Sequence, residues 1–362
     1  MTAPLSPPPW PIPPSWQVAL PARAADAEPS PPVPPGPAAP PATTPSVPPA
    51  TGTGPAGEGA GDGPSGARPE APPRLVVVFA PEGSAPVTGA VPSPPNGVRV
   101  ERRPAAGPVS TFAGVGELAR VVGRAIGDGA IGAVIVHPAE TLAETAWALE
   151  LLHEGDARLV FVAASGSPAD LADAIAVAAA GPQRLGCAVV ARGEIHAARH
   201  VTATGIAAPA FASPDAGPLG QVIGGIPRLV RRPPERFTVR GPFAGRPPRV
   251  GLHVVALGDD GRLLRTLADD CDGLIVASRA GQAALAALLP AVSETAARIP
   301  VVLHSPAAPP AGSAVTRLDP LKARVLMHLL LDTGHDRAAV LAAFAALEAG
   351  AAVPPAPPSA AF

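Results

Sequence analysis

Short β-branched runs alternate with Ala- and Leu-rich segments through most of this sequence. The apolar runs are RLVVVFA (74–80), GAVIVH (132–137), RLVFVAA (158–164) and GCAVVAR (186–192). Between them, GVGELARVVGRAI, TLAETAWALELLHE and PADLADAIAVAAA carry apolar residues at helical spacing. Wholly apolar strands that alternate with helices predict a mostly parallel sheet with helices on both faces, which is an α/β fold with a doubly wound sheet.

The pattern breaks once and then resumes. In residues 221–231, two short runs flank Gly224 and Gly225, and this predicts a β-hairpin. A polar, Pro-rich stretch follows, RRPPERFTVRGPFAGRPP, after which RVGLHVVAL, DGLIVAS and IPVVLHS restore the strand and helix rhythm. We expect a larger N-terminal domain at 73–235, a linker at 236–248 and a smaller C-terminal α/β domain at 249–350.

The two ends of the chain have a different composition. Residues 1–72 are dominated by Pro, Ala, Gly and Ser, and the tail at 351–362 is again rich in Pro and Ala. Such segments bury too little apolar surface to offset the entropy of ordering them. We therefore expect a disordered N-terminal arm and a disordered tail.

Charge and composition exclude several classes of partner. The net charge is −2 and no basic block stands out, so neither nucleic acid nor an anionic membrane is an expected partner. No run approaches the roughly 20 apolar residues of a membrane helix, and no secretory signal is evident. Cys187 and Cys271 form no metal or disulfide motif, which suits a reducing compartment. We expect a cytoplasmic protein without a cofactor.

Three segments resemble the bacterial-type L-asparaginase family. HPAETLAETAWALELL is similar to the family's His-Gly-Thr-Asp-Thr and the helix after it. GEIHAARHVTATGIAAPAFASPDAGPLGQVIGGIPRLVRRP resembles its Asp-Glu-Ile-His-Ala-Ala-Arg, Val-Thr-Lys-Thr and Gly-Pro-Leu-Gly stretch with the hairpin that follows. LDPLKARVLMHLLLDTGHD is similar to its C-terminal Pro-x-Lys-Ala-Arg helix. These matches fall in order along residues 74–348.

The resemblance implies a two-domain amidohydrolase fold. It also implies a homodimer or homotetramer, with each active site between the large domain of one subunit and the small domain of its partner. The family converts asparagine, and often glutamine, to the acid and ammonia through a nucleophilic threonine, without a metal. The ligand implied here is a small, asparagine-like amino acid.

Ser84 takes the place of the family's nucleophilic threonine. The family writes Thr-Gly-Gly-Thr after its first strand, where this chain has Pro81, Glu82, Gly83 and Ser84. A serine hydroxyl can serve as a nucleophile. Pro81 and Glu82, however, remove a backbone N–H and a flexible position beside the substrate. An ordinary loop hydroxyl is the alternative interpretation of Ser84.

The family's Thr-Asp pair is replaced by Ala139 and Glu140. Ala139 has no hydroxyl to act as a nucleophile, whereas Glu140 keeps a carboxylate at the position that grips the substrate's amino group. A structural interpretation is open for this region, because Thr141 and Glu144 form a capping-box pattern for the following helix.

The family's lysine and tyrosine are missing. The segment VTAT places Ala203 where the family has the lysine of Val-Thr-Lys-Thr. The only lysine in the chain, Lys322, belongs to the C-terminal helix motif, and the sequence contains no tyrosine. The family's lid tyrosine therefore has no counterpart either.

Two other patterns are set aside. GDGAIG, at 127–132, matches GxGxxG but precedes a strand, the reverse of a dinucleotide site. His196 and His200 are four residues apart, but no HExxH accompanies them and the resemblance places both in a loop, so we expect structural roles and no metal.

Removing one member of a cooperative catalytic unit costs several orders of magnitude in rate. The sequence therefore predicts an asparaginase-family protein with lost or strongly impaired catalysis and a binding or scaffold role. Two alternatives remain: a slow or altered-specificity amidohydrolase that uses Ser84 and Glu140, and a structural subunit that assembles with an active relative.

Overall fold

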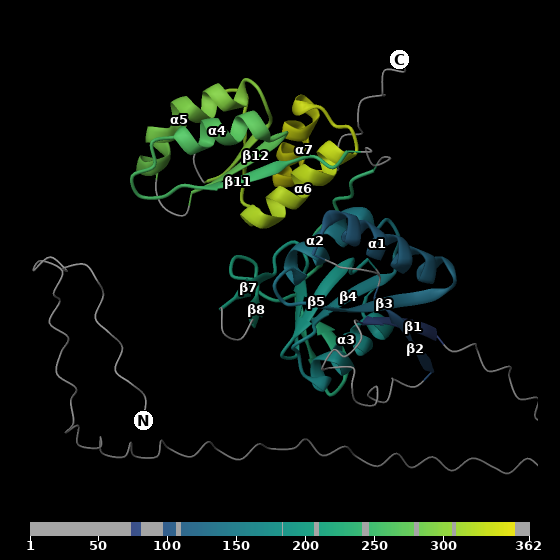
Figure 1. Cartoon of the computed structure of the whole chain (residues 1–362). Helices are drawn as coiled ribbons and strands as arrows, with labels where there is room; N and C mark the ends of the chain where they lie inside the picture. The colour runs from purple at the N-terminus through teal and green to yellow at the C-terminus, as the bar shows by residue number, and fades with distance from the viewer. Residues whose placement is uncertain are drawn as a thin grey trace, which may run out of the picture. The chain divides into compact units, whose positions relative to one another are not determined.

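The structure is a computed structural model that describes residues 74–80, 97–105, 110–182, 184–205, 210–240, 246–278, 282–305 and 309–351. The expected N-terminal arm, the tail from residue 352 onward and Ser84 lie outside the described residues. All the described residues belong to one compact unit. It contains two sheets with helices on both faces of each (Figure 1). The predicted α/β class with a doubly wound sheet is confirmed.

The first sheet has eight strands in the order β10-β9-β6-β5-β4-β3-β1-β2. The five strands from β5 to β2 are parallel, and β6, β9 and β10 extend the sheet as antiparallel strands. The strands are β1 (Arg74–Ala80), β2 (Val98–Pro104), β3 (Ala130–His137), β4 (Arg158–Ala163), β5 (Cys187–Ala191), β6 (Glu194–Ala197), β9 (Gly220–Ile223) and β10 (Ile226–Leu229).

Strand β2 was not predicted. Its sequence, VRVERRP, alternates charged and apolar residues, and the strand lies at the edge of the sheet beside β1. Arg103 and Glu101 form an ion pair along it, with Arg103 Nε 2.9 Å from Glu101 Oε1. An edge strand can carry such charges because much of it faces water, and this weakens the apolar signal that identified the central strands.

Helices cover the two faces of this sheet. Helices α1 (Phe112–Gly127) and α2 (Leu142–Leu152) share one apolar cluster with alternate residues of the strands. Helix α3 (Pro168–Ala180) covers the other face, in a second cluster. The central strands β1, β3, β4 and β5 therefore bury side chains in both directions, which is why their sequences are almost wholly apolar.

The hairpin predicted over 221–231 is confirmed. Strands β9 and β10 pair antiparallel on either side of Gly224 and Gly225, which have φ angles of 56° and 75°. Glycine reaches this left-handed region without a steric cost. A separate two-stranded ribbon pairs β7 (Thr202–Thr204) with β8 (Ala210–Ala212).

The second sheet has four parallel strands in sequence order. Helices α4 and α5 pack on one face of this sheet, and helices α6 and α7 pack on the other. The elements are β11 (Val250–Val254), α4 (Arg262–Asp270), β12 (Gly273–Ala277), α5 (Gln282–Ala296), β13 (Val301–His304), β14 (Ala314–Thr316), α6 (Pro320–Asp332) and α7 (Arg337–Ala349).

Helix α6 joins the second sheet to the first. The indole N–H of Trp147, on α2, donates to the carbonyl of Lys322, 3.2 Å away. The Lys322 ammonium donates to the carbonyls of Ala198, at 2.7 Å, and Val201, in the turn after β6. Burial lowers the Lys322 pKa to about 7. The only lysine of the chain is thus part of the internal packing.

The first residues of the expected linker at 236–248 are packed against α2. Val239 N–H donates to the Leu151 carbonyl at 2.8 Å, and Arg236 Nε donates to Glu150 Oε1 at 3.2 Å. The buried Glu150 also accepts from the Cys187 N–H at 2.5 Å. This stretch is therefore anchored at its start, where the polar composition suggested a free connection.

Candidate functional site

The order of the strands places a crevice at the carboxyl ends of the strands of the first sheet, here called its carboxyl edge. Strand β1 lies between β2 and β3, so the chain first moves one way along the sheet and then crosses back over β1 to form β3. In open α/β sheets, ligands bind at the carboxyl ends of the strands at such a reversal. In the register, Phe79 of β1 lies beside Ile135 of β3, so both strands end at this edge.

Ala139 and Glu140 lie at this edge, directly after β3. Ala139 is buried and belongs to the apolar cluster beneath α1 and α2, whereas Glu140 is exposed. The capping box expected for Thr141 and Glu144 is wrong, because the Thr141 side chain makes no capping hydrogen bond. Glu144 is instead partly buried toward α6, where burial raises its pKa and Arg324 opposes that shift.

His137, the last residue of β3, was not singled out from the sequence. Its side chain is fully buried, and Nδ1 lies 2.8 Å from the Pro138 carbonyl, so the proton sits on Nδ1. Nε2 has no partner among the described residues. Burial lowers the His137 pKa, which keeps the ring neutral. The sequence could have indicated His137, because it is the first residue of the HPAET segment that resembles the family.

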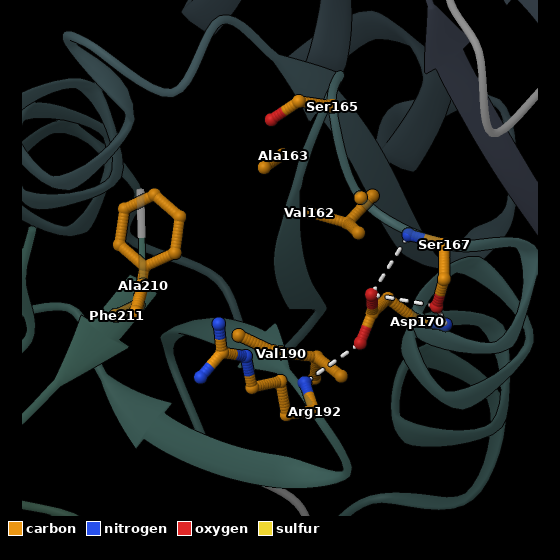
Figure 2. A pocket seen from close by; sticks show the side chains of 11 residues that line it. Val162, Ala163, Ser165, Ser167, Asp170, Val190, Arg192, Ala210 and Phe211 are labelled. Carbon is orange, nitrogen blue, oxygen red and sulfur yellow. Dashed lines mark hydrogen bonds between the residues drawn. The ribbon is translucent and has the colours of Figure 1, made fainter. Parts of the chain in front are cut away.

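A cavity of about 360 Å³ opens at the same edge of the sheet (Figure 2). The ends of β4 and β5, the first turn of α3 and strand β8 form its walls. The end of β3 adjoins this wall, because the N–H of Ala164, directly after β4, donates to the His137 carbonyl at 2.8 Å. The lining residues are Val162, Ala163, Ser165, Gly166, Ser167, Asp170, Val190, Ala191, Arg192, Ala210 and Phe211.

Asp170 fixes one wall of this cavity. Its Oδ2 accepts from the Ser167 N–H at 2.9 Å and from the Ser167 hydroxyl at 2.8 Å, and its own N–H donates to Ser167 Oγ at 3.1 Å. This capping box, with Pro168 in the first turn, starts helix α3. Oδ1 accepts from the Arg192 N–H at 2.7 Å, which ties the β5–β6 turn to the helix (Figure 2).

Arg192 and Gly193 form the tight turn between β5 and β6. Their φ angles are 53° and 74°, and Ala191 pairs with Glu194 across the turn. Such a mirror-image turn needs positive φ at both central positions, where Asn-Gly is the preferred pair. Within the described chain, no carboxylate pairs with the Arg192 guanidinium, which extends away from Asp170 in Figure 2.

Ala203 lies next to a residue of the cavity wall without lining the cavity itself. It pairs directly with Phe211 across the β7–β8 ribbon, and directly paired residues of antiparallel strands point to the same face. Phe211 lines the cavity and Ala203 is exposed, so the position of the family's lysine shares a face of the ribbon with Phe211. Thr202 points to the other face, where its hydroxyl lies 3.4 Å from Asp319 Oδ2.

The structure brings only some of the predicted positions together. Ala203 pairs with Phe211 of the cavity wall, while Ala139 and Glu140 follow β3 at the adjoining carboxyl ends of the strands, and none of the three lines the cavity. The lining holds one hydroxyl–carboxylate pair, Ser167 and Asp170, and both groups are already used in the helix cap. The arrangement suits binding better than nucleophilic chemistry, which needs a hydroxyl beside a free base.

The structure describes both histidines of the segment EIHAARH. His196 lies in strand β6, in place of the expected loop, and its Nδ1 is 3.1 Å from the Ser213 hydroxyl. No group of three potential metal ligands occurs in the part of the chain that the structure describes. Within the same residues, no helix is long and apolar enough to cross a membrane.

The fold and the edge cavity define a doubly wound α/β protein with a candidate ligand site at the carboxyl ends of its strands. Residues 106–235 match the family model for the N-terminal domain of asparaginases. This match supports an asparaginase-family assignment for that part of the chain.

Solved structures support the fold. The crystal structure of a probable cytoplasmic L-asparaginase from Campylobacter jejuni is similar, with a TM-score of 0.63 and 21% sequence identity. The alignment covers 75% of this chain and 99% of that one. No curated protein sequence matches the chain significantly.

Proposed function

We propose that this chain is an asparaginase-family protein whose catalysis is lost or strongly impaired, and that it binds a small amino-acid ligand at the carboxyl edge of its first sheet. One observation carries the proposal. Where the family resemblance implies a lysine, the chain has Ala203, which pairs with Phe211 of the cavity wall. A methyl group can neither accept nor deliver the proton that amide hydrolysis must move.

Ala139 supports the same conclusion. It stands where the resemblance implies a hydroxyl, and its side chain is buried in the apolar cluster beneath α1 and α2. Two members of one catalytic unit are therefore alanines. Each such loss typically costs several orders of magnitude in rate, and a second loss adds little because the unit has already failed.

The alternative function is a slow or altered-specificity amidohydrolase. The exposed carboxylate of Glu140 favours this alternative, because it lies at the carboxyl edge of the first sheet, where a substrate's amino group would be held. Ser84 would be the nucleophile in this mechanism.

Ammonia release separates the two functions. The purified full chain is mixed with L-asparagine or L-glutamine, ammonia is followed over hours, and binding of each amino acid is measured by calorimetry. The proposal expects stoichiometric binding without turnover. Steady turnover that Ser84→Ala abolishes would establish the amidohydrolase instead, and Ser293→Ala is the matched control, because it removes an exposed hydroxyl on α5 that does not line the cavity.

We also propose that the protein acts as a cytoplasmic homodimer or homotetramer. Exposed apolar side chains gather near the carboxyl end of β11 and the start of α4: Val254, Leu257 and Leu263 are 51%, 106% and 69% exposed. Contact with a second copy would remove them from water. Sedimentation of the wild-type chain and of Leu257→Glu tests this proposal. We expect the wild type to sediment as an oligomer and the new charge in Leu257→Glu to weaken the association of its subunits. An exclusive complex with an active relative would favour the subunit role.

A further inference from the structure

The edge cavity contains a cation without a counterion. Arg192 lines it, and within the residues that the structure describes its guanidinium forms no ion pair. The other charged group of the lining is Asp170, whose two carboxylate oxygens are occupied by Ser167 and by the Arg192 N–H. The cavity therefore presents one unpaired positive charge.

The backbone at Arg192 is fixed, although the residue itself is exposed. The turn is closed by the β5–β6 pairing and is bonded to Asp170, which is itself fixed at the start of α3. Asn and Gly are the residues that this backbone conformation favours, since a larger side chain at positive φ is strained. Arginine thus occupies the turn although smaller residues would fit it better, and its long side chain extends toward Phe211 and Ala210 (Figure 2).

The rest of the cavity suits a small, partly apolar molecule. Val162, Val190 and the ring of Phe211 supply apolar surface, and Ser165 supplies a hydroxyl. The volume of about 360 Å³ is at the low end for ligand pockets. A ligand of amino-acid size with one anionic end would fit within it and pair with the guanidinium.

We propose that Arg192 binds a carboxylate of the ligand, so that the site selects small carboxylic acids. This inference rests on the proposed ligand site and names the chemistry that the site recognises. A guanidinium matches a carboxylate with two parallel N–H···O bonds. Phosphate is disfavoured, because the carboxylate of Asp170 in the same lining would repel a second negative charge, and the N-terminus of α3 is already capped.

Arg192→Asn isolates the contribution of the guanidinium. Asn tolerates positive φ, so this variant keeps the turn and removes the charge. Arg184→Asn is the matched control, because Arg184 also has positive φ, 65°, and its side chain is 85% exposed ahead of the amino end of β5. Both variants lose one positive charge from a left-handed position.

The probes are succinate, L-asparagine and the uncharged succinamide, titrated by calorimetry, with inorganic phosphate as a separate arm. We expect Arg192→Asn to weaken succinate and asparagine binding by at least about tenfold and Arg184→Asn to leave both unchanged. Added salt should weaken the wild-type binding, and succinamide should be insensitive to either variant.

Several outcomes would overturn the inference. These are equal binding by wild type and Arg192→Asn, tighter binding of phosphate than of succinate, or no carboxylate binding by the wild type. Turnover of asparagine would overturn the proposed function alone. In that case Arg192→Asn should raise KM about tenfold, so the two failures remain distinguishable.

Discussion

The contact of α6 with the first sheet and the carboxyl edge of that sheet are built in opposite ways. At the α6 contact, Trp147 donates to Lys322, the Lys322 ammonium donates to Ala198 and Val201, and the rings of Phe112 and His328 stack with centroids 3.5 Å apart. At the edge, alanines replace the expected hydroxyl and lysine. One region is built from buried polar contacts, while the other has alanines at two positions where the family resemblance implies reactive side chains.

The difference follows from what each side chain does for folding. A buried ammonium with two carbonyl partners cannot be removed without leaving those carbonyls unsatisfied. An exposed methyl such as Ala203 leaves no group without a partner. Exposed positions at the carboxyl ends of the strands can therefore change without loss of the fold.

The largest expected effect comes from Lys322→Met, which breaks the α6 contact. We expect the free energy of unfolding to fall by about 4 kcal/mol, because the buried carbonyls of Ala198 and Val201 lose their donor. Urea unfolding followed by Trp fluorescence measures this. Arg262→Met, on the surface of α4, is the control and should change stability by less than about 0.5 kcal/mol. Equal midpoints for the two variants would contradict the role of Lys322.

Gly186→Ala tests the buried carboxylate beside α2. Gly186 has a φ of 68°, and a Cβ there would lie 2.4 Å from Glu150 Oε2, the oxygen that accepts from Cys187. We expect a loss of about 3 kcal/mol from strain and a displaced buried carboxylate. Gly97→Ala shares the positive φ, 73°, but its Cβ meets nothing within 4 Å, so about 1 kcal/mol is expected. Thermal unfolding of both variants provides the comparison.

Acid should weaken the α6 contact through His328. Burial and the nearby Arg324 lower the His328 pKa from 6.5 to about 4. Between these values the unfolded chain binds a proton that the folded chain does not, so stability falls as the pH drops from 6.5 toward 4, by about 2 kcal/mol. His328→Phe keeps a ring against Phe112 and removes the titration. Its unfolding free energy should depend less on pH, and an unchanged acid slope would refute this assignment.

Glu140→Ala, at the edge, has the smallest expected effect on stability. The side chain is exposed, so the unfolding free energy should stay within about 0.5 kcal/mol of wild type. Ligand binding is the second measurement, and the proposed function expects it to weaken if Glu140 holds an amino group. A large loss of stability would show that Glu140 has a structural role. It would then contradict the difference drawn here between the α6 contact and the carboxyl edge of the first sheet.

The sequence predicted the parts of the fold that have regular periodicity. Central strands such as 132–137 are wholly apolar because both faces are buried, and Gly224-Gly225 marked a hairpin because only glycine reaches both turn angles freely. Strand β2 escaped because its charges reflect an edge position. The capping box at Thr141 failed because Glu144 lies toward Arg324 on α6, a contact that local sequence does not record.

For the candidate site too, some features follow from the sequence and others only from the tertiary structure. Sequence by itself determined the order of the central strands and helices, the family resemblance and the positions where alanines stand in place of the family's threonine and lysine, since these depend on residue identity. Tertiary structure alone decided that Ala203 and Phe211 share one face, that His137 is buried, and that Arg192 extends unpaired into the edge cavity. Strand register and turn geometry bring together residues that are distant in sequence, and no local pattern encodes that proximity.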